Sequence, residues 1–518
     1  MTTPRAPSAS PSASSDAGVL ALCVASLLAR FALASSGYAD ALASRVELAT
    51  PADALARTRE GWALATIGVS PYRGSQCHAP PLALLALGAA SAADAGALAI
   101  APFVLADGLA ALALASIAAA FRRASGAEAR HRHVAPAAIA AAYLANPMSV
   151  AACVARSSVS AQNALAFGAA AFAVAGDAKL CALAFAALCS LAGHERLVLF
   201  APLALVLRRG ADVAPLEVVP ESRKGKGGAD AAAAAARARA GGSGVSGPGM
   251  SAFGRLFRES SPSSPPVALE RAHRTYAGAF AAMFIWFGAF GAALFAANRI
   301  ACRRFLACDD SARDPLDWVR GAFGFRVYAT DLRPNLGVRW YFFTEMFDEF
   351  NGFFLFAMVV FPYLVAVPAL ARFGDRRPAL ALFLALVAAD AFGAYPTLGS
   401  LAGALGFLPL FSVTPRVSRG SRPPLESSTA APGFVVAALF AFAIVLAPIF
   451  WRLWIETRAA NANFFFGACL AYFAARAALA VETARRAIAN DRAIKYANGG
   501  EGGAGGAGGV GGGGMKTE

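Results

Sequence analysis

Long apolar runs are the feature that most constrains the fold of this 518-residue chain. A helix that crosses a bilayer core needs about 20 apolar residues, and its backbone must satisfy its own hydrogen bonds there. Apolar residue types make up 58% of the chain and charged types only 15%, against about 25% in soluble proteins. The sequence therefore predicts an all-α, polytopic membrane helical bundle. It excludes an ordinary soluble enzyme, a disordered protein and a disulfide-stapled secreted domain.

Twelve apolar runs are predicted to cross the membrane. They cover residues 17–36, 95–120, 134–155, 157–176, 178–192, 196–207, 275–298, 351–371, 379–394, 397–413, 432–450 and 464–482. The neighbouring run at 80–93 is interpreted as a helix lying at the membrane surface. One more crossing there would reverse the sidedness that the loop charges indicate.

The charges of the loops predict how these spans are oriented. Residues 121–133 hold four Arg and one Glu, and residues 208–274 hold eleven basic and six acidic residues. Residues 36–79 hold four of each sign, and residues 301–331 hold five of each. Because cytoplasmic loops of membrane proteins retain the excess of Lys and Arg, we expect the first two loops and both termini in the cytosol. This excess also explains the net charge of +14 without a nucleic-acid partner.

Composition divides the chain into five parts. They are a disordered cytosolic N-terminus at 1–16, a first membrane bundle at 17–209 with a luminal loop at 36–94, a low-complexity cytosolic linker at 210–266, a second membrane bundle at 267–497 with a luminal loop at 299–350, and a Gly-rich disordered tail at 498–518. The linker and tail are rich in Gly, Ser, Ala and Pro, a composition typical of flexible segments. We assign them no chemistry.

The first luminal loop is long enough to be functional. Its acids Asp40, Glu47 and Asp53 are far apart in sequence, so we interpret them as solvated loop charges and not as a catalytic pair. His78 is expected to fix a turn at the membrane boundary. The chain has no phosphate-binding, zinc-protease or serine-nucleophile motif, and we expect no metal and no cofactor.

In the second luminal loop, Cys302 and Cys308 would form a disulfide if that loop faces an oxidising lumen. The sequence leaves this pairing open, because nothing in it fixes the distance between the two thiols.

An aromatic and acidic band follows a turn marked by Pro334 and Gly337. Its aromatic and sulfur-containing members are Trp340, Tyr341, Phe342, Phe343, Met346, Phe347, Phe350, Phe353 and Phe354, and its acids are Glu345, Asp348 and Glu349. Trp and Tyr at this depth are ordinarily membrane anchors. Acids at a membrane edge are costly and indicate a site. Both interpretations stay open at this stage.

A second polar segment lies before the last span, where Asn461 and Asn463 precede three Phe residues. An Asn at the start of a helix is often just an N-cap, which is the alternative to a binding role. A third polar segment, the hairpin tip formed by Arg156, Ser157 and Ser158, separates two spans.

Six stretches of the sequence resemble one known family. They are RVELATP at 45–51, IGVSPYRG at 67–74, YLANPMSVAACVARS at 143–157, DLRPNLGVRWYFFTEMFDEF at 331–350, AYPTLG at 394–399 and LWIETRAANANFFF at 453–466. In this order they are similar to PIG-U, a family of polytopic subunits of the glycosylphosphatidylinositol (GPI) transamidase complex. The stretch at 331–350 is the most specific of them.

The resemblance implies a function that composition does not show. The complex lies in the endoplasmic reticulum membrane, cleaves a C-terminal signal from a precursor protein and joins the new carboxyl end to the ethanolamine of GPI. The resemblance further implies an architecture like that of GT-C mannosyltransferases. It implies a non-catalytic role, with the chemistry in a caspase-like protease subunit. The expected partners are the other transamidase subunits, the GPI glycolipid and membrane lipid.

We combine the aromatic and acidic band with this resemblance to predict a GPI site. The acyl chains are expected against Phe342, Phe343, Met346, Phe347 and Phe464. The glycan and its phosphates are expected near Asp331, Asn335, Glu345, Asn461 and Asn463, with Trp340 and Tyr341 in the same site.

Two other functions are considered. The first is an active GT-C-type mannosyltransferase that uses a dolichol-linked sugar and an acid of the first luminal loop, such as Asp40 or Glu47. The second is a transporter, for which Arg30, Asp94, Asp107 and Asp390 are the candidate intramembrane charges. Transporters often carry internal repeats, and none is evident here, so neighbour-paired charges that hold helices together are the preferred explanation.

Overall fold

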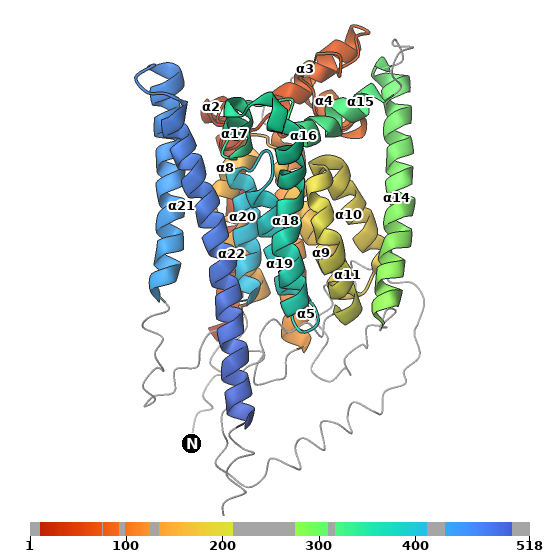
Figure 1. The fold of residues 1–518 in the computed structure, drawn as a ribbon. Helices are drawn as coiled ribbons and strands as arrows, with labels where there is room; N and C mark the ends of the chain where they lie inside the picture. The colour runs from red at the N-terminus through yellow and green to blue at the C-terminus, as the bar shows by residue number, and fades with distance from the viewer. Residues whose placement is uncertain are drawn as a thin grey trace, which may run out of the picture. The chain divides into compact units, whose positions relative to one another are not determined.

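The computed structural model describes residues 11–74, 76–92, 99–124, 134–210, 275–308, 316–411 and 430–499 (Figure 1). The chain divides into two compact units, residues 1–215 with 260–481, and residues 216–259 with 482–518. The first unit holds the helices described below, and the described part of the second is the C-terminal end of the last helix. The predicted linker at 210–266, apart from its first residue, lies outside the described residues. Residues 500–518 of the tail and the basic loop at 125–133 also lie outside them.

Every predicted span contains a helix. In the N-terminal half these are α1 (Pro11–Ala34), α5 (Ala101–Ala124), α7 (Pro136–Leu144), α8 (Pro147–Val154), α9 (Val159–Ala175), α10 (Ala178–Ala192), η2 (His194–Leu199) and α11 (Phe200–Arg209). In the C-terminal half they are α14 (Tyr276–Phe305), α18 (Asn351–Phe373), α19 (Pro378–Ala391), α20 (Leu398–Phe407), η7 (Leu408–Phe411), α21 (Ala430–Trp451), η9 (Arg452–Glu456) and α22 (Ala462–Gly499). The described ranges contain no strand, which confirms the helical class.

Five of the described helices are long and apolar enough to cross a membrane, and a bent pair makes a sixth. The chain is therefore a membrane protein of several spans, while the number twelve stays a prediction. The shorter apolar helices include α9, α10 and α19. All fourteen residues of α19 are buried by neighbouring helices.

The span predicted at 134–155 is a broken helix, because α7 and α8 meet at a break and bend by 53°. Pro147 lacks the N–H that a continuing helix would bond. The side chain of Asn146 caps the new helix by accepting a hydrogen bond from the Met148 amide at 2.9 Å. The last helix, in contrast, continues well beyond the predicted end at 482.

Short helices cover one end of the bundle, which we call the capped end (Figure 1). They are α2 (Tyr38–Ala43), α3 (Leu55–Thr66), α4 (Pro81–Ala92), α15 (Asp317–Val319), α16 (Phe325–Tyr328) and α17 (Arg339–Glu345). Helix α4 occupies the run at 80–93 that was predicted to lie at the membrane surface, and it packs beside α3 and α14. The capped end thus consists of helices from the two predicted luminal loops, 36–94 and 299–350.

Buried ion pairs connect the helices inside the bundle. Arg30 on α1 contacts Asp107 on α5 at 3.1 Å, and both residues are fully buried. Asp390 on α19 contacts Arg196 at 2.7 Å and Arg476 on α22 at 3.4 Å. Three of the four candidate intramembrane charges are therefore paired across helices, as the helix-packing interpretation predicts. The fourth, Asp94, lies outside the described residues.

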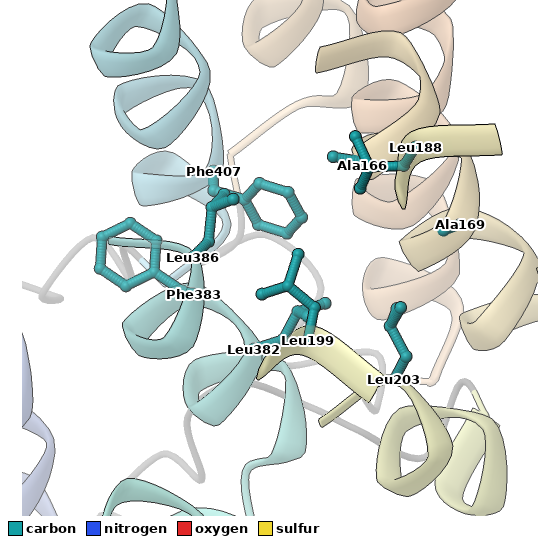
Figure 2. Close-up of a pocket in the computed structure, with 9 residues that line it drawn as sticks. All are labelled: Ala166, Ala169, Leu188, Leu199, Leu203, Leu382, Phe383, Leu386 and Phe407. Atoms are coloured by element: carbon teal, nitrogen blue, oxygen red, sulfur yellow. The ribbon is translucent and has the colours of Figure 1, made fainter. Parts of the chain in front are cut away.

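A small apolar pocket lies in the core between α9, α10, α11, α19 and α20 (Figure 2). Its lining residues are Ala166, Ala169, Leu188, Leu199, Leu203, Leu382, Phe383, Leu386 and Phe407. Ligand sites ordinarily combine apolar walls with a few polar groups that fix orientation, and this lining has no such group. Polar groups of the kind that a ligand site needs lie instead at the capped end.

Candidate functional site

The turn before α17 is built on Asn335, which is fully buried. Its side-chain Oδ1 accepts a hydrogen bond from the Gly337 amide at 2.7 Å. Its backbone carbonyl accepts bonds from Trp340 Nε1 at 2.9 Å and from Cys469 Sγ on α22 at 3.2 Å. Asn335 was predicted to face the glycan, but in this structure it fixes the turn and connects α17 to α22.

Trp340 and Tyr341 join the two segments that the sequence singled out separately. Trp340 stacks on Trp454 with ring centroids 6.0 Å apart, and Tyr341 stacks on Phe466 at 4.2 Å. The Tyr341 hydroxyl also donates a hydrogen bond to the side-chain oxygen of Asn463. We call Trp340, Tyr341, Trp454, Phe465 and Phe466 the aromatic cluster.

The outer edge of the aromatic cluster combines polar groups with exposed apolar rings. Asn461, Asn463 and Glu345 are exposed, and the side chains of Phe347 and Phe464 are 74% and 54% exposed. Asn461 Oδ1 accepts the Asn463 amide at 3.1 Å, so the N-cap alternative holds for Asn461. Large exposed apolar rings beside polar groups are typical of a binding surface or a membrane interface.

The remaining predicted acyl contacts pack among themselves on α17 and α18. Phe342 lies edge-on to Phe343 at 5.5 Å and to Phe354 at 4.9 Å. Phe343 is buried, whereas Met346 is half-buried at the end of α17. The band predicted from sequence therefore divides into buried rings that fix α17 and exposed rings that are free to contact lipid.

Asp331 lies in a separate group of residues, which we call the arginine cluster: Arg57, Gln76, His78, Asp331 and Arg333. Its carboxylate lies 3.5 Å from Arg57 Nη1, 3.2 Å from His78 Nε2 and 3.9 Å from Arg333 Nε. Burial by itself raises the pKa of Asp331, but the His78 hydrogen bond and the Arg57 charge hold that pKa below its usual value.

Stacked rings position the arginine cluster on the bundle. The His78 ring stacks on Phe325 at 3.7 Å, and Phe325 stacks on Tyr395 at 5.4 Å. The Tyr395 hydroxyl donates to the Asp331 carbonyl at 2.6 Å, and His78 Nδ1 lies 2.8 Å from the Gly321 carbonyl. His78 was expected to fix a local turn, and its contacts with Gly321 and Asp331 connect the two predicted luminal loops.

Sequence reasoning missed Arg57, Phe325, Tyr395 and Glu195. Glu195 lies 3.5 Å from Arg326 and 3.5 Å from Arg339, and its Oε1 accepts the Ala394 amide at 2.8 Å. One signal was usable, since Glu195 is an acid at the break between two apolar runs, but its partners are more than 130 residues away.

The three candidate acids of the first predicted luminal loop each have a partner. Asp53 is buried and accepts hydrogen bonds from Thr50 at 2.6 Å, Ser158 at 3.1 Å and Gln162 at 2.6 Å. Glu47 is also buried and contacts Arg45 at 3.0 Å, whereas exposed Asp40 contacts Arg156 at 2.5 Å. The prediction of solvated loop charges is wrong for Asp53 and Glu47, because the folded loop covers them.

Cysteine chemistry at the capped end is structural. Cys302 and Cys308 form a disulfide that closes the end of α14, which settles the pairing that the sequence left open. The Cys77 thiol is buried, and this burial raises its pKa to about 11. A thiol nucleophile needs a lowered pKa, so Cys77 is not suited to that role.

These features define a class of protein: a helical membrane protein of several spans whose capped end carries an aromatic cluster and an arginine cluster. The chain belongs to the PIG-U family, because the family model described as GPI transamidase subunit PIG-U matches residues 24–472. This match confirms the family that the six stretches predicted.

Individual relatives agree with this membership. The GPI-anchor transamidase component PIGU of Homo sapiens is 25% identical over 476 residues, which cover 88% of this chain and 89% of the human protein. The corresponding protein of Cricetulus griseus is 30% identical over 156 residues, covering 30% of this chain and 33% of that protein. The GPI transamidase component GAB1 of Saccharomyces cerevisiae is 36% identical over 149 residues, covering 29% and 34%. The chain thus aligns with about a third of the length of the hamster and yeast proteins.

Proposed function

We propose that this chain is a non-catalytic subunit of a GPI transamidase complex in the endoplasmic reticulum membrane. Its capped end faces the lumen, binds GPI and presents the glycolipid to a caspase-like protease subunit that performs the chemistry. Twelve crossings in a GT-C-like arrangement place both termini in the cytosol. The names of the relatives, each a component of a GPI transamidase, support the membership of this complex.

The lipid-binding part of the proposal is supported by the residues exposed where α17 meets α22. There Asn461, Asn463 and Glu345 lie exposed around the aromatic cluster, and exposed Phe347 and Phe464 extend the apolar surface. A glycolipid presents sugars and phosphates above its acyl chains. Exposed amides can donate hydrogen bonds to the sugars and accept them, and a carboxylate can accept them. The aromatic rings cover the acyl chains.

Two features support the proposed sidedness. Helices α11, α14 and α18 meet at the end opposite the capped end (Figure 1), where Arg208 and Arg209 contact Asp375. Basic residues concentrate on the cytosolic side of membrane proteins. The Cys302–Cys308 disulfide closes α14 at the capped end, and disulfides persist in the lumen of the endoplasmic reticulum but rarely in the cytosol.

The pairing of the first-loop acids supports a non-catalytic role. A general base must be free to accept a proton from the acceptor hydroxyl. Asp53 already accepts three hydrogen bonds, and Glu47 and Asp40 each lie against an arginine. An assay of the purified chain with dolichol-linked mannose is expected to show no transfer. Transfer abolished by an Asp40 or Glu47 substitution would establish the mannosyltransferase alternative instead.

The lipid-binding proposal is tested by Asn463→Ala in cells that lack the endogenous subunit. We expect GPI attachment to a reporter protein to fall several-fold at equal subunit level, because the loss of one hydrogen bond costs about 1 kcal/mol. Crosslinking of a photoactivatable GPI analogue to the subunit should fall in parallel. Thr66→Ala, which alters an exposed hydroxyl on α3 at the capped end, is the matched control and should leave both readouts unchanged.

Membership of the complex is measured separately, by co-purification with a caspase-like protease subunit. We expect Asn463→Ala to keep this co-purification, because the side chain is exposed at the proposed lipid surface. Unchanged attachment together with unchanged crosslinking would remove Asn463 from the site. Failure of the unaltered chain to co-purify with such a subunit would contradict the proposed function itself.

A further inference from the structure

We propose that the arginine cluster is a phosphate-binding subsite, formed by Arg57 and Arg333 and positioned by Gln76. This inference rests on the proposed function and names the chemical group that the capped end takes from its ligand. The group is a phosphate ester, carried either by a phosphoethanolamine or by the inositol phosphodiester of a lipid headgroup.

The first argument is convergence of two guanidinium groups. Arg57 Nη1 and Arg333 Nη2 both donate to Gln76 Oε1, at 2.9 and 2.8 Å. Arg57 is further fixed by a hydrogen bond of 2.9 Å to the Gln76 carbonyl. Two cations that share one neutral amide oxygen repel each other, and a bound anion would relieve that repulsion. A planar guanidinium matches the geometry of phosphate oxygens and donates to two of them at once.

The second argument is the balance of charge. Among the described residues, Asp331 is the one carboxylate within 4 Å of the two guanidinium groups, and Arg57, Arg333 and His78 share it. Glu60, exposed one turn along α3, also acts on Arg57 through space. One carboxylate in contact therefore serves two guanidinium groups, and Glu60 adds its charge only from a distance.

The electrostatic state of Arg57 agrees with this balance. Burial lowers the pKa of the Arg57 guanidinium, and the nearby charge of Arg333 lowers it further. The charges of Asp331 and Glu60 act in the opposite direction and offset this lowering only in part. A phosphate placed between the two groups would favour both charges.

The third argument is access. The Arg333 side chain is 54% exposed, so its guanidinium is open to a ligand, whereas Arg57 is 10% exposed and forms the base of the site. Arg333 precedes Asn335, whose carbonyl contacts Trp340 of the aromatic cluster. One short segment therefore connects the proposed phosphate subsite to the proposed lipid surface.

This assignment gives Asp331 a defined role within the predicted site. The glycan and the ethanolamine phosphates were expected near this residue. In the structure Arg57, Arg333 and His78 surround its carboxylate, so little of its charge is available to a ligand ammonium. The cluster as a whole attracts an anion, and Asp331 limits that attraction.

The test is a binding measurement on the full-length chain in detergent. Phosphoethanolamine is titrated and followed by ³¹P line broadening, and phosphatidylinositol in nanodiscs is compared with phosphatidylcholine by native mass spectrometry. We expect Arg333→Gln to weaken binding about tenfold, since a charge-assisted hydrogen bond contributes roughly 1.5 kcal/mol or more. Arg333→Lys keeps the positive charge but loses the two parallel donors of the guanidinium, so it should bind more tightly than Arg333→Gln and more weakly than the unaltered chain.

Arg73→Gln is the matched control, because Arg73 is an exposed arginine on the same luminal loop as Gln76. It should bind both probes like the unaltered chain. Arg57→Gln should reproduce the loss seen for Arg333→Gln, and the melting temperature of each variant reports whether it is folded. Because Arg333 is half exposed, its variants test the proposal even where buried Arg57 does not tolerate substitution.

The direction in which Asp331→Asn changes phosphate binding decides between two roles for Asp331. The substitution removes a competing negative charge with little change of shape, so phosphate binding should tighten, whereas a carboxylate that holds the ligand ammonium would make it weaken.

If the ³¹P line broadening depends on Arg333, the subsite binds a free phosphate monoester. If the preference for phosphatidylinositol depends on Arg333, the subsite binds the lipid diester. Equal binding by Arg333→Gln, or an equal loss in Arg73→Gln, overturns the proposal. Co-purification with transamidase subunits would still stand in that case.

Discussion

At the residue scale, tertiary partners decide the role of each polar side chain. Asn335 and Asn463 are the same residue type in two recognisable stretches, yet Asn335 is fully buried in a turn and Asn463 is exposed beside Tyr341. Sequence placed both in the predicted GPI site. The difference arises because the Asn335 carbonyl faces Trp340 of α17 and Cys469 of α22, while its side-chain amide bonds within the turn. Asn463 also contacts α17 through Tyr341, but its side chain stays exposed.

Asp375 at the end opposite the capped end provides a prediction about pH. Its carboxylate accepts hydrogen bonds from the Tyr276 hydroxyl at 2.7 Å and from Arg208 at 2.5 Å, and these lower its pKa to about 2. An unfolded chain ionises this group near pH 4. Because the folded pKa is the lower one, the stabilisation is complete above about pH 4 and is lost as the pH falls towards 2.

The measurement compares the melting temperature of the unaltered chain with that of Asp375→Asn, in detergent, from pH 7 to pH 2. The unaltered chain should be the more stable by a constant margin down to about pH 4, and the margin should then shrink. Glu60→Gln, at an exposed acid of α3, serves as the control. A margin that grows as the pH falls would contradict the assigned direction.

At the element scale, buried ion pairs determine which helices lie together. The Arg30 guanidinium contacts Asp107 and also bonds the Leu144 carbonyl at 3.0 Å and the Ser149 hydroxyl at 2.9 Å. One side chain thereby joins α1 to α5 and to the break between α7 and α8. A helix break exposes backbone carbonyls that need donors, and Arg30 supplies one.

Arg30→Met should therefore be severely destabilising. Removal of one partner of a buried pair leaves an uncompensated charge, here Asp107, at a cost of about 3–5 kcal/mol. The double variant Arg30→Met with Asp107→Asn should recover part of that loss, because no buried charge remains. Thermal unfolding of the detergent-solubilised chain measures both, and a double variant no more stable than the single one would show that Asp107 is not the cause.

At the scale of the whole molecule, the number of free thiols tests whether the disulfide forms. The chain has eight Cys, of which Cys302 and Cys308 are paired and six are free. Denatured chain isolated from membranes should take up six maleimide labels without reductant and eight after reduction, as intact mass records. Cys302→Ser with Cys308→Ser should give six labels in both conditions. Eight labels before reduction would show that the disulfide does not form.

Each apolar run was recognisable because the cost of unpaired backbone groups at membrane depth permits only a helix there. The breaks inside the runs were harder to place. Pro147 marks one of them, but the 53° bend at that position depends on the packing of α8 against α20 and α1. The number of crossings is likewise not fixed by hydropathy, since short helices such as α19 are buried by their neighbours.

The candidate site was predictable in part. The segments 328–354 and 451–466 each stand out by their aromatic and polar residues, and the structure joins them through Trp340, Tyr341 and Asn463. The arginine cluster was not predictable, because Arg57 and Arg333 are separated by more than 270 residues and nothing local in the sequence brings them together.

The sequence by itself determined the helical membrane class, the family and the two segments that form the aromatic cluster. These follow from local properties, namely apolar length and specific residue patterns. Only the tertiary structure decided that Asp331 lies between Arg57 and Arg333, that Asp53 is buried and that Cys302 bonds Cys308. The physical reason is that burial and charge neutralisation depend on which distant groups the folded chain brings within a few ångströms.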